Sequence, residues 1–230
     1  MTRKRRRFLG TPEMMVGLAL LLGNVCAKAD DLSSLTAEWW QWALSIPSTV
    51  SPLEDNTGEN CVVGQRSSVW FLAGSFFGGT ATRRCNVPEG VTLFFPVSNA
   101  VNFNTPNVCG QVQASISVKD LRATSAAFIE GVTNMEVDLD GKPLRDVKRT
   151  QSRVFPVALP ADNVFNSFCG GPASVPAGIY SPGVDDGFYV WLNPLKPGNH
   201  KLHFHAENSG QAFMEDITYQ LTIVPVSSKD

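Results

Sequence analysis

The sequence predicts a mainly β domain, an antiparallel β-sandwich or jelly-roll with two peripheral helices. Segments with period-two alternation recur along the chain, whereas only two segments have a helical period. Hydrophobic residues make up 43% of the chain, and its 14 Phe and 5 Trp can fill a substantial core. Charged residues reach only 17%, so the composition does not indicate disorder.

Residues 1–29 are expected to be an export signal. Residues 3–7 form a basic run, residues 14–27 are apolar, and Ala27-Lys28-Ala29 is typical of a cleavage site. The run Arg5-Arg6-Arg7-Phe8-Leu9 resembles the twin-arginine signal, and a general secretory signal stays open as the alternative. Residues 30–230 would then form one β-sandwich domain in the periplasm or outside the cell.

The charge of this mature chain excludes two classes of partner. Without residues 1–29, the chain keeps 13 of its 19 basic and 20 of its 21 acidic side chains, a net charge of −7. A net-acidic domain without a basic cluster is a poor match for nucleic acid or an anionic membrane surface. No span of the mature chain is expected to cross a membrane.

Four cysteines of the mature chain are expected to form two disulfides. They are Cys61, Cys85, Cys109 and Cys169. An even number in an exported domain indicates disulfides, and three pairings are open. We expect the sequential pairing, Cys61 with Cys85 and Cys109 with Cys169, because it closes the shorter loops. No C-x-x-C is present, which disfavours a zinc site built on cysteines.

The first expected element of the mature chain is a helix over residues 34–46, which ends before Pro47. Trp39 and Trp42 fall on its apolar stripe and would pack against the sheet. Trp40 lies off that stripe and is expected at the surface, where it is a candidate contact for a stacked sugar.

Alternation of apolar and polar residues predicts the strands, and segments rich in Gly, Pro and Asn predict the loops. Strands are expected at residues 68–73, 82–86, 91–97, 135–139 and 152–159. Long connections are expected at residues 48–64, 74–79, 99–110 and 161–183. A second helix is expected over 117–130, with Ser117 and Asp120 placed as in a capping box.

Residues 187–207 are the best-defined part of the predicted sheet. Residues 187–192 are apolar on both faces and should be buried on both sides. Residues 200–207 alternate between an apolar and a polar face, and a short turn joins the two strands. A last strand, 217–224, should pair antiparallel with 200–207, so three neighbouring extended segments are expected.

Four motifs carry a family resemblance. They are Trp70-Phe71-Leu72-Ala73-Gly74, Cys85-Asn86-Val87-Pro88-Glu89-Gly90, Leu93-Phe94-Phe95-Pro96-Val97 and Asp216-Ile217-Thr218-Tyr219. Together they resemble a group of uncharacterised exported bacterial proteins over most of the mature chain. The resemblance implies class and location, but no activity. Residues 195–202 also resemble the L-x-P-G-x-H-x-L turn of immunoglobulin-like bacterial domains, which implies a structural role for His200.

Two hypotheses of function follow. In the first, His203, His205 and Glu207 leave one face of a strand and would hold a divalent transition metal, in a metal-binding protein or a metalloenzyme. A further ligand from Asp185 or Asp186 would be needed. The simpler interpretation is a solvated strand face, because two-residue spacing is automatic in any strand. No other cofactor is indicated.

In the second hypothesis the domain is a binding or structural module for a glycan or a protein. Its candidate contacts are Trp40, Tyr180, Asp185 and Asp186. Hydrolase chemistry has little support, since no G-x-S-x-G is present and no pair of carboxylates has a defined separation. The binding module is the preferred interpretation.

Overall fold

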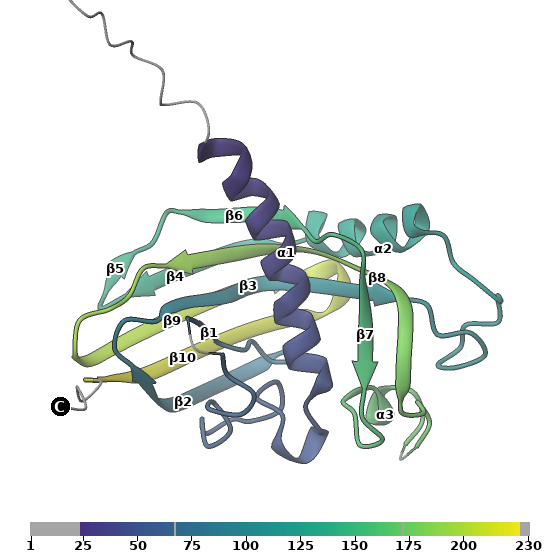
Figure 1. The fold of residues 1–230 in the computed structure, drawn as a ribbon, viewed down its shortest axis with the longest axis horizontal. Coiled ribbons are helices and arrows are strands. Elements are labelled where there is room, and N and C mark those ends of the chain that lie inside the picture. The colour runs from purple at the N-terminus through teal and green to yellow at the C-terminus, as the bar shows by residue number, and fades with distance from the viewer. Residues whose placement is uncertain (1–23, 67, 172, 226–230) are drawn as a thin grey trace, which may run out of the picture.

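The computed structural model describes residues 24–66, 68–171 and 173–225 (Figure 1). Most of the expected export signal therefore lies outside the described residues. Within them, ten strands form two five-stranded sheets, accompanied by three α-helices. The mainly β class predicted from the sequence is confirmed.

The two sheets have the following composition. Sheet A has the order β1 (Val69–Phe71), β3 (Thr92–Phe103), β8 (Gly178–Leu192) and β6 (Val147–Gln151), and β7 (Phe155–Leu159) also pairs with β8. Sheet B has the order β2 (Gly79–Pro88), β10 (Phe213–Val224), β9 (Gly198–Asn208), β4 (Thr133–Leu139) and β5 (Lys142–Pro143). The helices are α1 (Asn24–Ser45), α2 (Val118–Glu130) and α3 (Phe165–Phe168).

Strand pairing is antiparallel at most positions. The expected pairing of β9 with β10 is confirmed, with Phe204 opposite Ile217. Two pairs, β1 with β3 and β2 with β10, are parallel. The chain visits sheet B through β2 between β1 and β3, and such a crossover is what a parallel pair requires.

The expectation that residues 187–192 and 200–207 are neighbouring strands is wrong. Strand β8 lies in sheet A and β9 in sheet B, so their connection passes from one sheet to the other. The difference follows from their side chains. Residues 188–192 of β8 are apolar on both faces and need a core on each side, whereas β9 has one polar face and belongs in an outer layer.

Sheet A is the middle layer of the molecule. One core lies between the sheets, where Phe95 and Phe204 stack with centroids 5.3 Å apart. A second core lies between sheet A and α1, where Phe94 and Tyr189 stack at 5.2 Å. Helix α1 crosses the strands of this face (Figure 1) and buries Trp39 there. Successive residues of β3 thus enter different cores.

Several element boundaries differ from the prediction. Helix α1 begins at Asn24 rather than residue 34, and the expected cleavage site, residues 27–29, lies inside it. Half of the expected loop 99–110 is strand β3, and the end of the expected loop 161–183 is strand β8. Strands β5 and β6 and helix α3 were not predicted, since they are short and lack clear periodicity.

Three further predictions concern local structure. Helix α2 is confirmed, and the backbone N–H of Asp120 donates to Ser117 Oγ at its start. The sequential disulfide pairing is confirmed, with Cα atoms 6.0 Å apart for Cys61–Cys85 and 5.0 Å apart for Cys109–Cys169. None of the helices in the described part of the chain has the length and apolar character that crossing a membrane requires.

Candidate functional site

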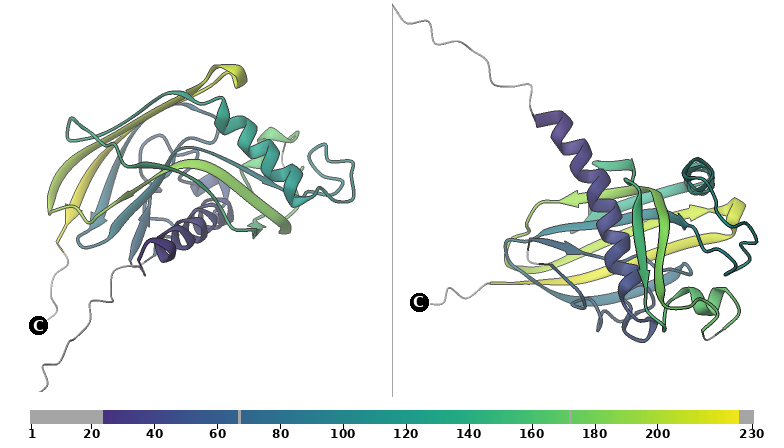
Figure 2. Two further views of the ribbon diagram at one scale, coloured as in Figure 1. Left: turned by 90° about the horizontal axis from the view of Figure 1, so that it is seen from above. Right: turned by 45° about the vertical axis from the view of Figure 1, so that its right-hand side comes forward.

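A cavity of about 1040 Å³ lies at one end of the molecule, between α2, α3 and the ends of β3 and β10. Figure 2 shows α2 and α3 at this same end. The volume is at the upper end of the range for sites that hold a small organic ligand. Two of its lining residues, Phe77 and Phe168, are 54% and 71% exposed. Large exposed aromatic side chains beside a cavity indicate a binding surface.

Phenylalanine dominates the lining of this cavity. Seven of the 14 phenylalanines of the chain line it, namely Phe76, Phe77, Phe103, Phe128, Phe165, Phe168 and Phe213. Phe165 makes edge contacts with Phe76 and Phe103, each with centroids 5.1 Å apart. Phe128 and Phe213 form a second edge pair at 5.5 Å, which joins α2 to the start of β10. We call this cavity the phenylalanine pocket.

One carboxyl group lies in the phenylalanine pocket. Glu215, in β10, is 4% exposed, and its Oε2 accepts a hydrogen bond of 3.2 Å from the backbone N–H of Ser75. The carboxyl group also packs against Gly74, where a Cβ atom would lie 2.3 Å from Oε2. A side chain at position 74 would therefore displace the carboxyl group from its present position.

Burial controls the charge of Glu215. Removal from water raises the pKa of this carboxyl group to about 8, against the opposing effects of the Ser75 hydrogen bond and the positive charge of Arg83. At neutral pH the group is therefore mostly protonated. A neutral carboxyl group can donate a hydrogen bond as well as accept one.

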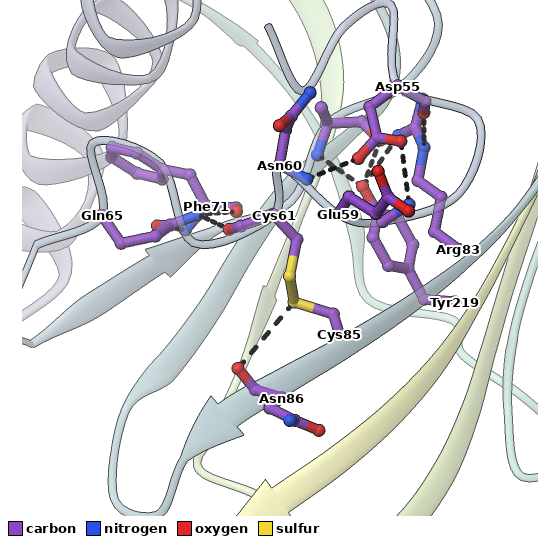
Figure 3. Close-up of a disulfide and its surroundings, with 12 residues drawn as sticks. Asp55, Glu59, Asn60, Cys61, Gln65, Phe71, Arg83, Cys85, Asn86 and Tyr219 are labelled. Atoms are coloured by element: carbon purple, nitrogen blue, oxygen red, sulfur yellow. Dashed lines mark hydrogen bonds between the residues drawn. A yellow bond between two sulfur atoms is a disulfide. The ribbon is translucent and has the colours of Figure 1, made fainter. Parts of the chain in front are cut away.

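Arg83 anchors the wall behind Glu215. Its guanidinium group is 1% exposed and donates to the carbonyl oxygens of Asp55, Ala73 and Gly74. It also donates to the Tyr219 hydroxyl at 2.8 Å, which in turn bonds the Ala73 backbone (Figure 3). The motifs at residues 70–74 and 216–219 thus meet at Arg83.

The loop beside Arg83 is fastened by Asp55. Burial alone would raise the pKa of Asp55, but hydrogen bonds from Asn60, Thr57 and Gly58 outweigh it and lower the pKa below its usual value. The Cys61–Cys85 disulfide joins this loop to β2 (Figure 3). The Asp55 carbonyl oxygen that accepts from Arg83 therefore lies in a loop that is fixed both by the Asp55 hydrogen bonds and by the disulfide.

A buried polar network lies behind another part of the pocket. Trp40 Nε1 donates to Asp185 Oδ1 at 2.7 Å, and the Tyr189 hydroxyl donates to Asp185 Oδ2 at 2.9 Å. Asn99, which lines the pocket, donates to the Tyr189 hydroxyl at 3.0 Å. Burial raises the pKa of Asp185 well above its usual value, and these hydrogen bonds oppose the shift.

The expected surface position of Trp40 is wrong. The residue is 4% exposed, although it lines the pocket. The reason is that β7 runs beside α1, where Gln41 bonds the Pro156 carbonyl, so the buried part of α1 is wider than one stripe. Trp40 therefore cannot serve as an open platform for a sugar.

The other proposed binding residues lie apart from the open pocket. Asp186 is 1% exposed and forms a two-bond ion pair with Arg149, with distances of 3.1 and 2.9 Å, supported by Gln151. Tyr180 packs against Phe103 of the pocket at 5.9 Å, and burial raises the pKa of its hydroxyl group. Of the four candidates, Trp40 lines the pocket and Tyr180 supports it.

His203 and His205 lie on the outer face of sheet B, as expected from the alternation that buries Leu202 and Phe204, whereas His200 falls on the Leu202 side of that alternation near the start of β9. His203 hydrogen-bonds Asp216 at 2.7 Å and Asp138 at 3.3 Å. His200 bonds Asp140, and this bond raises the pKa of the imidazole above its usual value.

The proposed metal ligands do not form a metal centre with Asp185 or Asp186. His205 bonds Glu207 at 3.2 Å on sheet B, whereas the two aspartates lie in sheet A. Across the described ranges, no group of three or more His, Cys, Asp or Glu side chains has an arrangement that could hold a metal ion. The metal hypothesis therefore gains no support from the fold.

Sequence reasoning did not identify Glu215 or Arg83. Both lie at inward positions of alternating strands, Glu215 in line with Ile217 and Tyr219, and Arg83 in line with Cys85. A charged residue at an inward position is the signal that would have identified them, because burial of a charge needs a compensating partner. The disulfide Cys109–Cys169 also lines the pocket, which its sequence position did not indicate.

Comparison with known proteins adds no relative. No protein-family model matches the chain, and no curated protein matches it.

Proposed function

We propose that this chain is an exported binding module that holds a small, largely apolar molecule in the phenylalanine pocket. The observation that carries this proposal is the gathering of half of the chain's phenylalanines around one open cavity of about 1040 Å³. Phe76, Phe103 and Phe165 also pack against the second core, whereas Phe77 and Phe168 are exposed beside the cavity, as at a binding surface. Apolar lining with a few polar groups is typical of ligand sites.

Other features support the exported, binding character of the chain. Two disulfides tie the loops of the domain, which is usual in oxidising compartments. The family resemblance of the four motifs points to the same location and stays a prediction. The burial of Trp40 removes the sugar platform of the glycan hypothesis, and for this reason the proposal rests on the pocket.

The proposal is tested with prodan, a neutral naphthalene dye that carries one ketone and emits at shorter wavelength in apolar surroundings. We expect saturable binding to the oxidised protein. Ala127→Trp places an indole in the pocket from α2, so prodan affinity should fall about tenfold or more. Lys119→Trp is the control, since Lys119 is an exposed residue of α2 outside the pocket lining. Equal binding by both variants and the wild type would refute the proposal.

A further inference from the structure

We propose that Glu215 is the specificity-determining residue of the phenylalanine pocket, and that its carboxyl group donates a hydrogen bond to an uncharged oxygen of the ligand. The ligand class is therefore an apolar molecule with a carbonyl, ether or alcohol oxygen. This inference rests on the proposed function, because it concerns the same pocket.

The lining of the pocket offers one ionisable group to a ligand. Among the described residues that line the pocket, Glu215 is the single ionisable side chain, because Cys109 and Cys169 are joined in a disulfide. A charged ligand group would meet no second charge in the lining to pair with. Removing an unpaired charge from water costs several kcal/mol, so an uncharged ligand is favoured.

The two carboxyl oxygens of Glu215 have different surroundings. Oε2 is occupied by the backbone N–H of Ser75 and packs against Gly74. Oε1 has no hydrogen-bond partner within the described part of the chain. The side chain is 4% exposed and borders the cavity, so a ligand that displaces solvent from the pocket can reach Oε1.

The protonation state of Glu215 allows it to donate a hydrogen bond. Burial favours the neutral carboxyl group, whose pKa is raised to about 8. In that state the oxygen that faces Ser75 accepts a hydrogen bond, while the hydroxyl group can donate to the ligand. An oxygen acceptor on the ligand completes this arrangement. A group that can only donate would leave the hydroxyl proton without a partner.

The charged groups around Glu215 argue against a cationic ligand. Arg83, from β2, is the charged residue that acts on Glu215, and its positive charge lowers the Glu215 pKa. The adjoining Tyr219 of β10 is bound to Arg83. The loop at 74–77 and the part of α2 that lines the pocket contribute no titratable side chain. An amine would therefore enter the field of a buried guanidinium group.

The test compares two neutral dyes on the full disulfide-bonded protein. Prodan carries a ketone, and dimethylnaphthylamine has the same ring and amine without it. At about pH 6 the wild type should bind prodan roughly tenfold more tightly, the value of one hydrogen bond in a dry site. At about pH 10 Glu215 is ionised and cannot donate, so we expect this preference to disappear.

Glu215→Gln separates recognition from a structural role. The glutamine amide keeps an acceptor for Ser75 and a donor for the ligand at every pH. The variant should therefore keep its preference for prodan at both pH values, whereas the wild type loses it. A ketone preference that is the same in wild type at both pH values would overturn the inference, and so would tighter binding of naphthylmethylammonium than of prodan.

The two failures are distinguishable. If both dyes bind equally and Ala127→Trp weakens both, the pocket binds ligands and the assigned role of Glu215 is wrong. If neither dye binds, or Ala127→Trp has no effect, the proposed function fails and the inference fails with it.

Discussion

At the scale of single residues, Glu215 is a buried carboxyl group that makes the stability of this domain depend on pH. Its pKa is raised from 4.5 to about 8 by burial. Between these values the unfolded chain has released the proton and the folded chain still holds it. The folded state then binds more protons than the unfolded state, so stability falls as the pH rises through this window.

Glu215→Gln should remove this dependence. Relative to wild type, the variant should gain on the order of a few kcal/mol of unfolding free energy between about pH 4.5 and about pH 8. Its amide stays neutral across the window, while other titrating groups cancel in the comparison. Urea unfolding of both proteins at the two pH values measures the difference. If the unfolding free energy changes with pH by the same amount in both proteins, Glu215 is not buried as a neutral acid.

At the scale of elements, strand β6 is held to β8 by an ion pair with one buried partner. Arg149 is 39% exposed in its side chain, whereas Asp186 is 1% exposed. The neighbouring pair of Lys148 with Asp146 is exposed on both sides. The two pairs therefore differ mainly in whether a carboxylate would be left buried after the cation is removed.

We expect Arg149→Met to destabilise the domain by about 2 kcal/mol, a value reduced from that of a fully buried pair because solvent screens the exposed guanidinium group. Lys148→Met, on the same strand, should cost less than about 0.5 kcal/mol. Denaturant midpoints of the two variants check this. Losses of equal size would mean that the burial of Asp186 contributes nothing.

At the scale of the whole molecule, the two disulfides have similar effects on stability and different effects on the pocket. They close loops with sequence separations of 24 and 60 residues. Either separation gives an expected stabilisation of about 3 to 4 kcal/mol. Only the Cys109–Cys169 disulfide lines the phenylalanine pocket, where it joins the loop after β3 to the residue that follows α3.

Double serine variants of each disulfide separate the two effects. Both should unfold at lower denaturant concentration, by similar amounts. Prodan affinity should fall in Cys109→Ser/Cys169→Ser and stay close to wild type in Cys61→Ser/Cys85→Ser, measured where both are folded. Loss of binding in the second variant alone would place the ligand near residue 61 instead.

The fold class and much of the sheet follow from local patterns. Strands β9 and β10 were predicted with their partner and inward faces because each has one apolar and one polar face. The partner of β8 could not be predicted, since a strand that is apolar on both sides carries no mark of which sheet it joins. Parallel edge pairs are likewise set by the path of the chain between sheets.

The candidate site was mostly beyond prediction. The pocket is assembled from segments near residues 39–40, 53, 74–77, 99–109, 123–128, 165–175 and 211–215, which only the fold brings together. The histidine face stood out in the sequence because its residues are adjacent in the chain. Residues that meet across long separations, such as Arg83 with Tyr219, give no such local pattern.

The placement of sheet A between two cores has a consequence for how the chain must mature. If the sheets pair before α1 docks, the surface that carries Phe94 and Tyr189 meets water as a continuous aromatic plane. Surfaces of this kind cause partly folded chains to associate. In that order of folding, docking of α1 covers this aromatic surface and protects the newly made protein from aggregation.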